Sequence, residues 1–139
     1  MGRWDWVGRV HLAIYRRSDG RIGHRLAGKP ILLLTSRGRR SGVLRTTPLL
    51  YYPDADDCPV IVASNGGQGH DPAWCHNLRA DPRAIIQIGR EHFEARAEFA
   101  DPAERGRLWP LLEAYNPPYR TYARRTERDI PVILLRRLA

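Results

Sequence analysis

The sequence predicts an α+β domain built around a small β-barrel. Roughly six strand-like runs and three or four helical segments are separated by turns rich in Gly, Pro and Asp. Several of the runs lie close together in sequence, which favours antiparallel pairing. The 139 residues are most simply one domain, with an ordinary globular balance of 27% charged and 42% hydrophobic residues.

The first unit, residues 3–17, places apolar side chains at helical spacing and basic side chains elsewhere. The residues that recur at this spacing are Trp4, Val7, Val10, His11 and Ile14. Such an amphipathic helix either packs on the body of the domain or lies on a membrane surface, and the pattern favours neither decisively. We therefore divide the chain into an N-terminal helix and linker over residues 1–29 and a barrel over residues 30–139.

Three apolar runs predict strands over residues 31–35, 43–52 and 60–64. Pro48 lies within the second run, and because proline cannot donate a backbone hydrogen bond, it indicates an edge position or a bulge. Residues 53–57 form a polar turn before the third run. Since the three runs are close in sequence, we expect them to pair as an antiparallel meander.

Capping residues and prolines mark the predicted helices. Asp71 is expected to cap a short helix that has Pro72 at its first position and ends at residues 81–82. A hairpin then joins residues 83–88 to residues 92–99, where apolar and charged side chains alternate as in a half-buried strand.

The C-terminal third repeats this pattern of caps and breaks. Asp101, Pro102 and Glu104 supply the N-cap, first-turn proline and capping-box glutamate of a helix that runs to about Tyr115. Residues 116–118 break the chain, a short helical segment follows, and residues 131–135 close the domain as a strand.

The chain is strongly basic, with a net charge of +8, and Lys29 is its only lysine. This charge suits nucleic acid, an anionic membrane surface or a polyanionic cofactor, although the aromatic residues are not interleaved as base-stacking platforms would be. No apolar run is long enough to span a bilayer, and the N-terminus lacks the apolar core of a signal peptide. Cys58 and Cys75 make no disulfide framework, so we expect a cytoplasmic protein.

Two glycine-rich loops carry the most informative chemistry, and each follows a strand-like run. The first covers residues 35–42 and is followed by Arg45, and the second covers residues 63–67 and is followed by Pro72 and Trp74. Glycine lets backbone N–H groups come close to an anion, and arginine adds forked, permanently charged donors. Together the loops predict a cradle for a phosphate-bearing ligand.

Three coupled motifs between about Pro30 and Leu135 resemble the deazaflavin-dependent nitroreductase family. They are Gly38-Arg39-Arg40-Ser41-Gly42 with Arg45 and Pro48-Leu49; Ala63-Ser64-Asn65-Gly66-Gly67 with Pro72-Ala73-Trp74 and Asn77-Leu78; and Pro118-Tyr119 with Tyr122 and Arg128-Asp129-Ile130-Pro131. Their shared order and spacing are more specific than a single glycine loop.

The resemblance implies an FMN-binding split-barrel-like fold, a split β-barrel with flanking helices, that binds coenzyme F-420. Family members pass a hydride from reduced F-420 to a quinone, a nitroaromatic or another electron-poor acceptor. The implied cofactor-binding residues are Arg39, Arg40, Ser41, Gly42, Arg45, Thr47, Pro48, Ala63, Ser64, Asn65, Gly66, Gly67, Pro72, Trp74 and Asn77. F-420 carries a phosphodiester and glutamates, which the arginines suit, whereas Trp74 could equally fill the core.

By the same resemblance, Ser64, Tyr119 and Tyr122 are the catalytic candidates, which orient the acceptor or relay a proton. The alternative for the two tyrosines is a lid that packs over the barrel. The chain departs from the family pattern at Asn65, often lysine there, and at Cys75, commonly tyrosine. These differences fall around the presumed acceptor pocket, so the cofactor is predicted more firmly than the acceptor.

Other classes of function remain open at this level. They are a split-barrel protein that binds FMN or haem, a basic nucleic-acid-binding module, and a carrier that binds F-420 without turnover. His70, Cys75 and His76 lack the repeated spacing of a metal site, so no metal is expected. The expected partner is a small-molecule electron acceptor, with membrane contact through residues 3–17 at the inner face of the cell membrane and a homodimer as further options.

Overall fold

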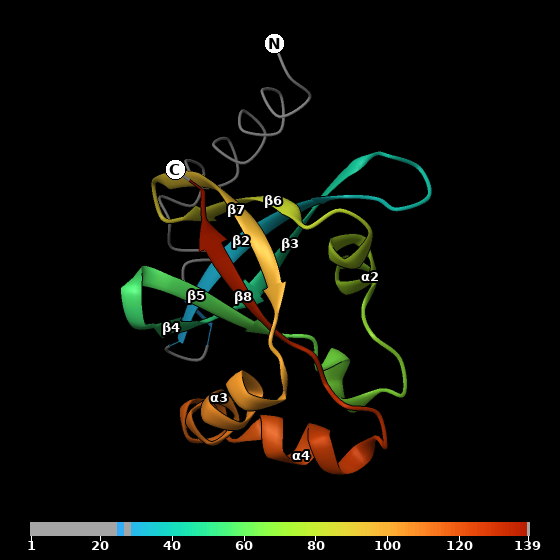
Figure 1. Ribbon diagram of the computed structural model, residues 1–139, viewed down its shortest axis with the longest axis vertical. Coiled ribbons are helices and arrows are strands. Elements are labelled where there is room, and N and C mark those ends of the chain that lie inside the picture. Colours follow the sequence, from blue (N-terminus) through green and yellow to red (C-terminus); the bar gives the residue numbers. More distant parts are fainter. Residues whose placement is uncertain (1–24, 27–28, 139) are drawn as a thin grey trace.

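The computed structural model describes residues 25–26 and 29–138, and the helix predicted over residues 3–17 lies outside them. Within the described ranges the chain forms eight strands and three α-helices (Figure 1). The strands are β1 (Arg25–Leu26), β2 (Lys29–Arg37), β3 (Leu44–Leu50), β4 (Tyr52–Asp54), β5 (Cys58–Val62), β6 (Arg83–Ile88), β7 (Glu91–Phe99) and β8 (Val132–Arg137). The helices are α2 (Ala73–Ala80), α3 (Pro102–Tyr115) and α4 (Pro118–Arg125), and 3-10 turns occupy Ala55–Asp57 and Asn65–Gly67.

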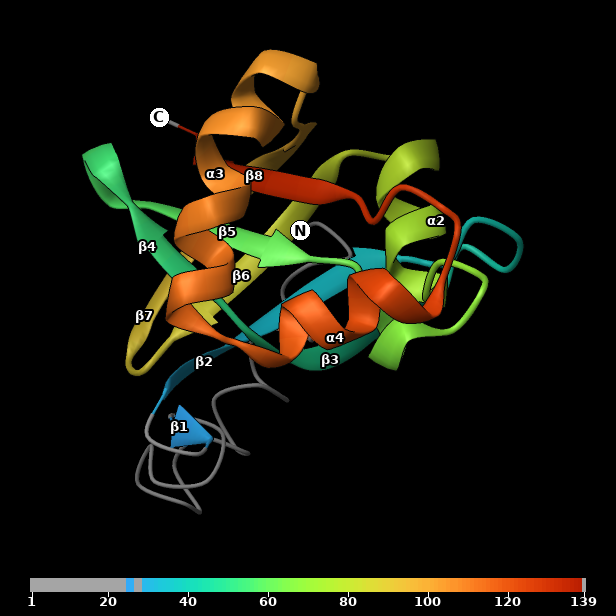
Figure 2. The ribbon, with the colours of Figure 1, turned by 90° about the horizontal axis from the view of Figure 1, so that it is seen from below.

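The strands form one curled antiparallel sheet in the order β1-β2-β6-β7-β8-β5-β4, and β3 also pairs with β2. β3, which pairs with β2 near one end of this path, runs almost directly into β4 at the other end, because β3 ends at Leu50 and β4 begins at Tyr52. The residue between them, Tyr51, donates its backbone N–H to the carbonyl of Pro30 at 3.4 Å. The passage from β3 to β4 therefore links the two sides of the curled sheet, which is a split barrel, as predicted (Figure 2).

The predicted meander is only partly correct. β2 and β3 pair as expected, with Thr35 opposite Thr46, and Pro48 lies in a strand that pairs only with β2 among the described strands. The third predicted strand, β5, pairs with β4 and with the C-terminal strand β8 rather than with β3. The reason is the break at Tyr51, which moves the chain from the β2 side of the barrel to the β5 side.

The hairpin of β6 and β7 and the start of α3 confirm their predictions. Phe93, Ala95 and Ala97 are buried on one face of β7, and Gly89 turns the hairpin at φ +59°. The carboxylate of Asp101 accepts the backbone N–H of Glu104 at 2.8 Å, which caps α3.

The predicted cap of α2 is wrong. The residue at the N-cap of α2 is Pro72, which forms no side-chain capping bond. The carboxylate of Asp71 lies 2.7 Å from Arg128 Nη1 and 3.3 Å from Arg79 Nη2. Two guanidinium partners offer a carboxylate stronger, charge-assisted bonds than a helix N–H, so Asp71 ties α2 to the C-terminal segment instead.

Two hydrophobic cores hold the molecule together. One fills the barrel and joins strand residues such as Leu34, Ile86 and Ile133 to Trp74 and Leu78 of α2. The other lies between β5 and β8 on one side and α3 and α4 on the other; its members include Val60, Leu134, Leu108, Leu112 and Tyr119. The two sets alternate along β5 and β8, so both strands are buried on both faces.

Candidate functional site

The first glycine-rich loop is the turn between β2 and β3, and it projects from the barrel above α2 (Figure 1). The N–H of Gly38 donates to the carbonyl of Val43 at 2.8 Å, and the N–H of Gly42 donates to the carbonyl of Gly38 at 2.9 Å. Gly42 has φ +73°, a conformation that favours glycine, so its role here is to close the turn. Its N–H is already used within the turn, whereas Arg40 and Ser41 project at the exposed tip.

Three arginines at this loop are not neutralised by neighbouring carboxylates. Arg39, Arg40 and Arg45 are exposed and take part in none of the ion pairs within the described residues. Thr47 and Pro48 follow on β3, opposite Leu34 and Leu33 of β2. The end of the hairpin is consequently a concentration of positive charge that suits an anion.

Helix α2 positions the first loop. The side-chain carbonyl of Asn77 accepts the backbone N–H of Arg39 at 3.0 Å, and Asn77 is only 4% exposed. Trp74, one turn earlier on the helix, is 9% exposed and belongs to the barrel core. Of these two predicted cofactor-binding residues, Asn77 orients the loop and Trp74 fills the core.

The second glycine-rich loop leaves β5 and doubles back in a tight turn. Ser64 has right-handed helical angles, and Asn65, Gly66 and Gly67 follow with φ of 49°, 65° and 82°. Asparagine tolerates this left-handed region better than most residues, and the Asn65 amide donates to the carbonyl of His70 at 3.1 Å. The conformation of the turn explains why an asparagine and two glycines stand together.

The two glycines have different surroundings. A Cβ added to Gly67 would lie 3.1 Å from Arg125 Cβ and from Tyr122 Cα, so this glycine lets the turn pack against α4. Nothing lies within 4 Å of a Cβ added to Gly66, where a ligand could approach the backbone.

Arg128 holds the second loop through hydrogen bonds to its backbone carbonyls. It is not among the site residues predicted from the sequence. Its guanidinium donates to the carbonyls of Ala63, Ser64 and Gln68 at 3.1, 2.9 and 2.9 Å, and to Asp71 at 2.7 Å. Arg128 is part of the C-terminal motif, but sequence spacing cannot show that it contacts a loop about 60 residues earlier in the chain.

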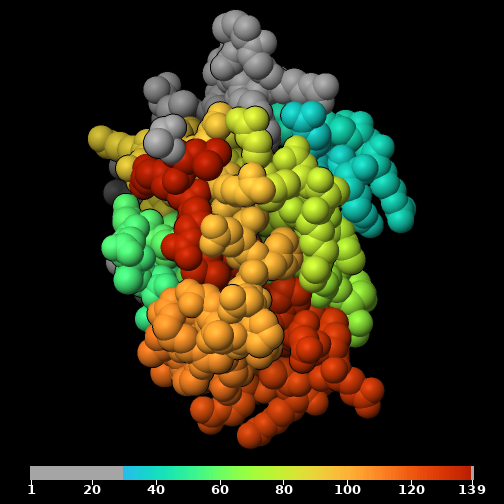
Figure 3. Space-filling view, in the orientation of Figure 1, coloured from blue at the N-terminus to red at the C-terminus, as the bar shows by residue number. Residues whose placement is uncertain are grey.

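An open pocket of about 410 Å³ brings the two loops together. Its lining combines Arg39 of the first loop with residues of the second loop and of the start of α2, namely Asn65, Gln68, His70, Asp71, Pro72, Ala73 and His76. Figure 3 shows the β2–β3 turn, α2 and α4 along one side of the molecular surface. A second open pocket of about 470 Å³ lies between α2, β7 and α3 and contains none of the predicted site residues.

Ser64 and the two candidate tyrosines lie near the second loop, in different environments. Ser64 is half-buried, and its hydroxyl makes no hydrogen bond with the described part of the chain. Tyr119 is 6% exposed in the outer core, where burial raises its pKa to about 12 against the lowering effect of a hydrogen bond with Asn116. Tyr122 is half-buried on α4 and meets the Tyr119 ring edge-on at 6.4 Å between centroids.

These observations define a split-barrel protein with a basic, glycine-rich candidate site, and comparison with known proteins identifies its family. The family model for F420H(2)-dependent quinone reductase matches residues 6–137. An F420H(2)-dependent quinone reductase of Mycobacterium tuberculosis is 43% identical over 133 residues, covering 93% of this chain and 89% of that protein. The chain belongs to the F420H(2)-dependent quinone reductase family.

Two solved structures agree with this assignment. An F420-H2 dependent reductase, FDR-A, is 34% identical with a TM-score of 0.69, covering 76% of this chain and 93% of that chain. A structure described as a domain-swapped dimer is 31% identical with a TM-score of 0.71, covering 96% and 99% of the two chains.

Family membership confirms the predicted oxidoreductase class and the predicted cofactor, coenzyme F-420. It supports the main hypothesis rather than a protein that binds FMN, haem or nucleic acid. A quinone-type small-molecule acceptor fits the family. None of the helices in the described ranges is long and apolar enough to cross a membrane.

Proposed function

We propose that this chain binds reduced F-420 in the pocket between the two loops and α2, and passes a hydride from it to a quinone-type acceptor. The observation that carries the proposal is that one pocket is lined by both loops: the first loop, whose arginines have no carboxylate partner, and the glycine-rich second loop. A hydrogen bond from the Arg39 N–H to Asn77 fixes the first loop on α2.

The residues at the first loop fit the anionic end of the cofactor. Arg39, Arg40 and Arg45 are exposed and unpaired within the described residues, so their guanidiniums are available to a phosphodiester or carboxylate. Gly42 closes the turn that presents them, and Thr47 and Pro48 extend the same edge of the barrel. The second loop, from Ala63 to Gly67, faces the other end of the ligand, with Gly66 as the point of closest approach.

Bound F-420 supplies the hydride, so the protein mainly positions donor and acceptor and keeps them together. Ser64 can orient the acceptor through its available hydroxyl. Tyr122, at the edge of the second loop, is the better placed of the two tyrosines to pass a proton to the product. Tyr119 supports it from the core, because its buried hydroxyl already interacts with Asn116.

The first test is a fluorescence titration of the purified protein with oxidised F-420 and, in parallel, with FMN. We expect binding of F-420 only, weakened about tenfold by Arg39→Ala or Arg45→Ala, since each removes a charge-assisted hydrogen bond. Arg90→Ala is the matched control, because Arg90 is equally exposed but lies in the β6–β7 turn. Preference for FMN would overturn the cofactor assignment.

Steady-state assays separate an enzyme from a carrier. Oxidation of reduced F-420 in the presence of menadione, and separately of a nitroaromatic, is expected to show turnover that depends on the acceptor. Tight binding of F-420 without turnover of either would indicate a carrier instead.

Membrane contact at the inner face of the cell membrane is part of the proposal, because quinones partition into lipid. Residues 3–17 would provide it through their basic amphipathic pattern. In co-sedimentation with anionic vesicles, Val7→Glu and Val10→Glu in the full chain should reduce pelleting. Equal pelleting of the wild type and these variants would exclude contact through this helix.

A further inference from the structure

Arg128 lies outside the pocket lining, and its guanidinium makes four hydrogen bonds. Its Nε, Nη1 and Nη2 atoms all donate, and the four acceptors come from the second loop and the segment between that loop and α2. Its side chain is only 15% exposed, as is that of Asp71. Hydrogen bonds of this charged, shielded kind are stronger than those between neutral groups in water.

The hydrogen bonds from Arg128 to two backbone carbonyls also fix the direction of the N–H groups that follow those carbonyls. In a trans peptide the C=O of one residue and the N–H of the next point in opposite directions, and the described chain has no cis peptide. The carbonyls of Ala63 and Ser64 point to Arg128. The N–H groups of Ser64 and Asn65 therefore point away from Arg128.

These two N–H groups are available to a ligand. Neither donates to any acceptor within the described residues, whereas the N–H groups of Ala63 and Gly67 before and after them donate to the carbonyls of Pro131 and Ser64. The change from right-handed to left-handed backbone angles between Ser64 and Asn65 is the geometry that makes neighbouring N–H groups converge on an electron-rich atom.

We propose that Arg128 is a positioning residue that holds the second loop with its carbonyls inward, so that the Ser64 and Asn65 N–H groups bind an electron-rich oxygen of the ligand. The inference rests on the proposed function, which makes that ligand F-420. Arg128 acts only through the loop and through Asp71. Arg128 belongs to the segment between α4 and β8, so its hydrogen bonds couple that segment to the loop.

Arginine is required here because of its shape. A lysine at position 128 would keep the charge, but a single ammonium cannot reach three carbonyls and a carboxylate that surround a planar fork. Arg79 provides the matched control: it bonds the same Asp71 at 3.3 Å, its side chain is 50% exposed, and it donates to no loop carbonyl.

The test compares Arg128→Lys and Arg128→Ala with Arg79→Ala in the full-length protein. Amide hydrogen exchange of residues 63–71 is measured without cofactor, and the Kd for oxidised F-420 and the melting temperature are measured for each variant. Arg128→Lys is expected to speed exchange in this segment and to weaken F-420 binding about tenfold. Arg79→Ala should change neither, and millimolar guanidinium should restore binding to Arg128→Ala.

A merely structural role would lower the melting temperature while leaving the Kd of the folded protein unchanged, so that guanidinium would have no lost binding to restore. That result would overturn the inference. Should Arg128→Ala fail to fold, Asp71→Asn removes one charged partner and is expected to shift exchange and Kd in the same direction, by less. If the wild type does not bind F-420, the proposed function fails, and exchange in the free protein still decides whether Arg128 holds the loop.

Discussion

At the scale of single residues, the arginines in the described part of the chain divide into two groups with different consequences. Most of those on helices and strands, such as Arg83, Arg107 and Arg136, pair with a nearby carboxylate. Arg39, Arg40 and Arg45 take part in none of the ion pairs within the described residues, so three uncompensated positive charges lie together at the first loop. Exposed ion pairs contribute little to stability, whereas unpaired guanidiniums remain free to bind an anion.

Tyr119 provides a prediction about alkaline stability. Burial raises its pKa from 10.0 to about 12, so the folded state holds this proton more tightly than the unfolded state. The resulting stability is fully present below pH 10 and is lost as the pH rises toward 12. Urea unfolding between pH 8 and about pH 11 should show a decline that is smaller in Tyr119→Phe, where only the buried Cys58 and Cys75 thiols, whose pKa burial also raises, still contribute. A parallel decline in both proteins would contradict this explanation.

At the scale of elements, the second loop packs closely on α4. Three atoms, Arg125 Cβ, Arg125 Cδ and Tyr122 Cα, lie 3.1 Å from a Cβ added to Gly67. At Gly66 the backbone also has a positive φ, but the space around it is open. Comparing Gly66 with Gly67 therefore separates the effect of backbone conformation on stability from the effect of packing against α4.

We predict that Gly67→Ala lowers the free energy of unfolding by about 2–3 kcal/mol, and Gly66→Ala by about 1 kcal/mol. Both place a side chain at positive φ, but only the first also pushes α4 away from the loop. Chemical denaturation measures the difference. Equal losses would mean that α4 moves aside without cost.

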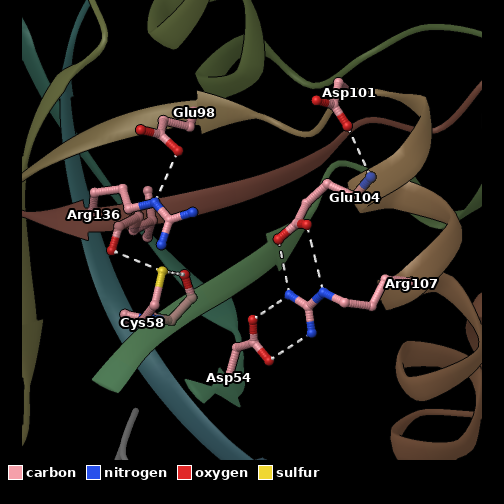
Figure 4. A network of polar contacts seen from close by, with 9 residues as sticks. Asp54, Cys58, Glu98, Asp101, Glu104, Arg107 and Arg136 are labelled. Carbon is pink, nitrogen blue, oxygen red and sulfur yellow. Dashed lines mark hydrogen bonds and ion pairs between the residues drawn. The ribbon is translucent and has the colours of Figure 1, made fainter. Parts of the chain in front are cut away.

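A second contact between elements joins α3 to the barrel. The guanidinium of Arg107 bonds Asp54 of β4 at 2.7 Å and Glu104 of its own helix at 2.9 Å (Figure 4). The hydrogen bond from Arg107 lowers the pKa of Asp54 below 3.8, against the opposing effect of burial. Because the folded pKa is depressed, the stabilisation is present above pH 3.8 and is lost as the pH falls through the folded pKa.

Arg107→Met should therefore lower the urea midpoint at pH 7, and the difference from wild type should shrink below pH 3.8. Arg120→Met is the control, because Arg120 makes one ion pair with Glu113 at 2.9 Å and its side chain is 62% exposed. A constant difference at all pH values would show that Arg107 contributes by packing rather than through Asp54.

At the scale of the whole molecule, the chain passes from β3 to β4 at Tyr51 and so links the two sides of the barrel. The loops that follow β2 and β5 lie on the same side of it, next to α2 (Figure 1, Figure 2). The arginine turn, the glycine turn and α4 come from distant parts of the sequence. The charged end of the pocket faces solvent, where salt screens electrostatic attraction.

Binding of F-420 should consequently weaken as salt rises. Between about 0.05 M and 0.5 M NaCl we expect a decrease in affinity of about tenfold, because the screening length falls well below the size of the pocket. The double variant Arg39→Ala, Arg45→Ala should show a flatter dependence in the same titration. Affinity that does not change with salt would place the anionic end of the cofactor away from the first loop.

Much of the element structure was predictable because its causes are local. Asp101 and Pro102 mark the start of α3, the alternation from Phe93 to Ala97 marks the buried face of β7, and the apolar run at Leu32 marks a buried strand. The cap of α2 was not predictable, because Asp71 has the residue type of an N-cap. Only the tertiary structure places Arg128 next to Asp71, where it is a stronger partner than a helix N–H.

The sequence by itself determined the barrel class, the order of the strands along the chain, the basic glycine-rich loops and, through their motifs, the F-420-dependent family. Each depends on neighbouring residues or on short spacings. Only the tertiary structure decided that β5 pairs with β8, that Asn77 orients the first loop, that Gly67 serves packing on α4, and that Arg128 holds the second loop. These contacts join residues far apart in the chain, and their partners are selected by packing geometry that no local pattern encodes.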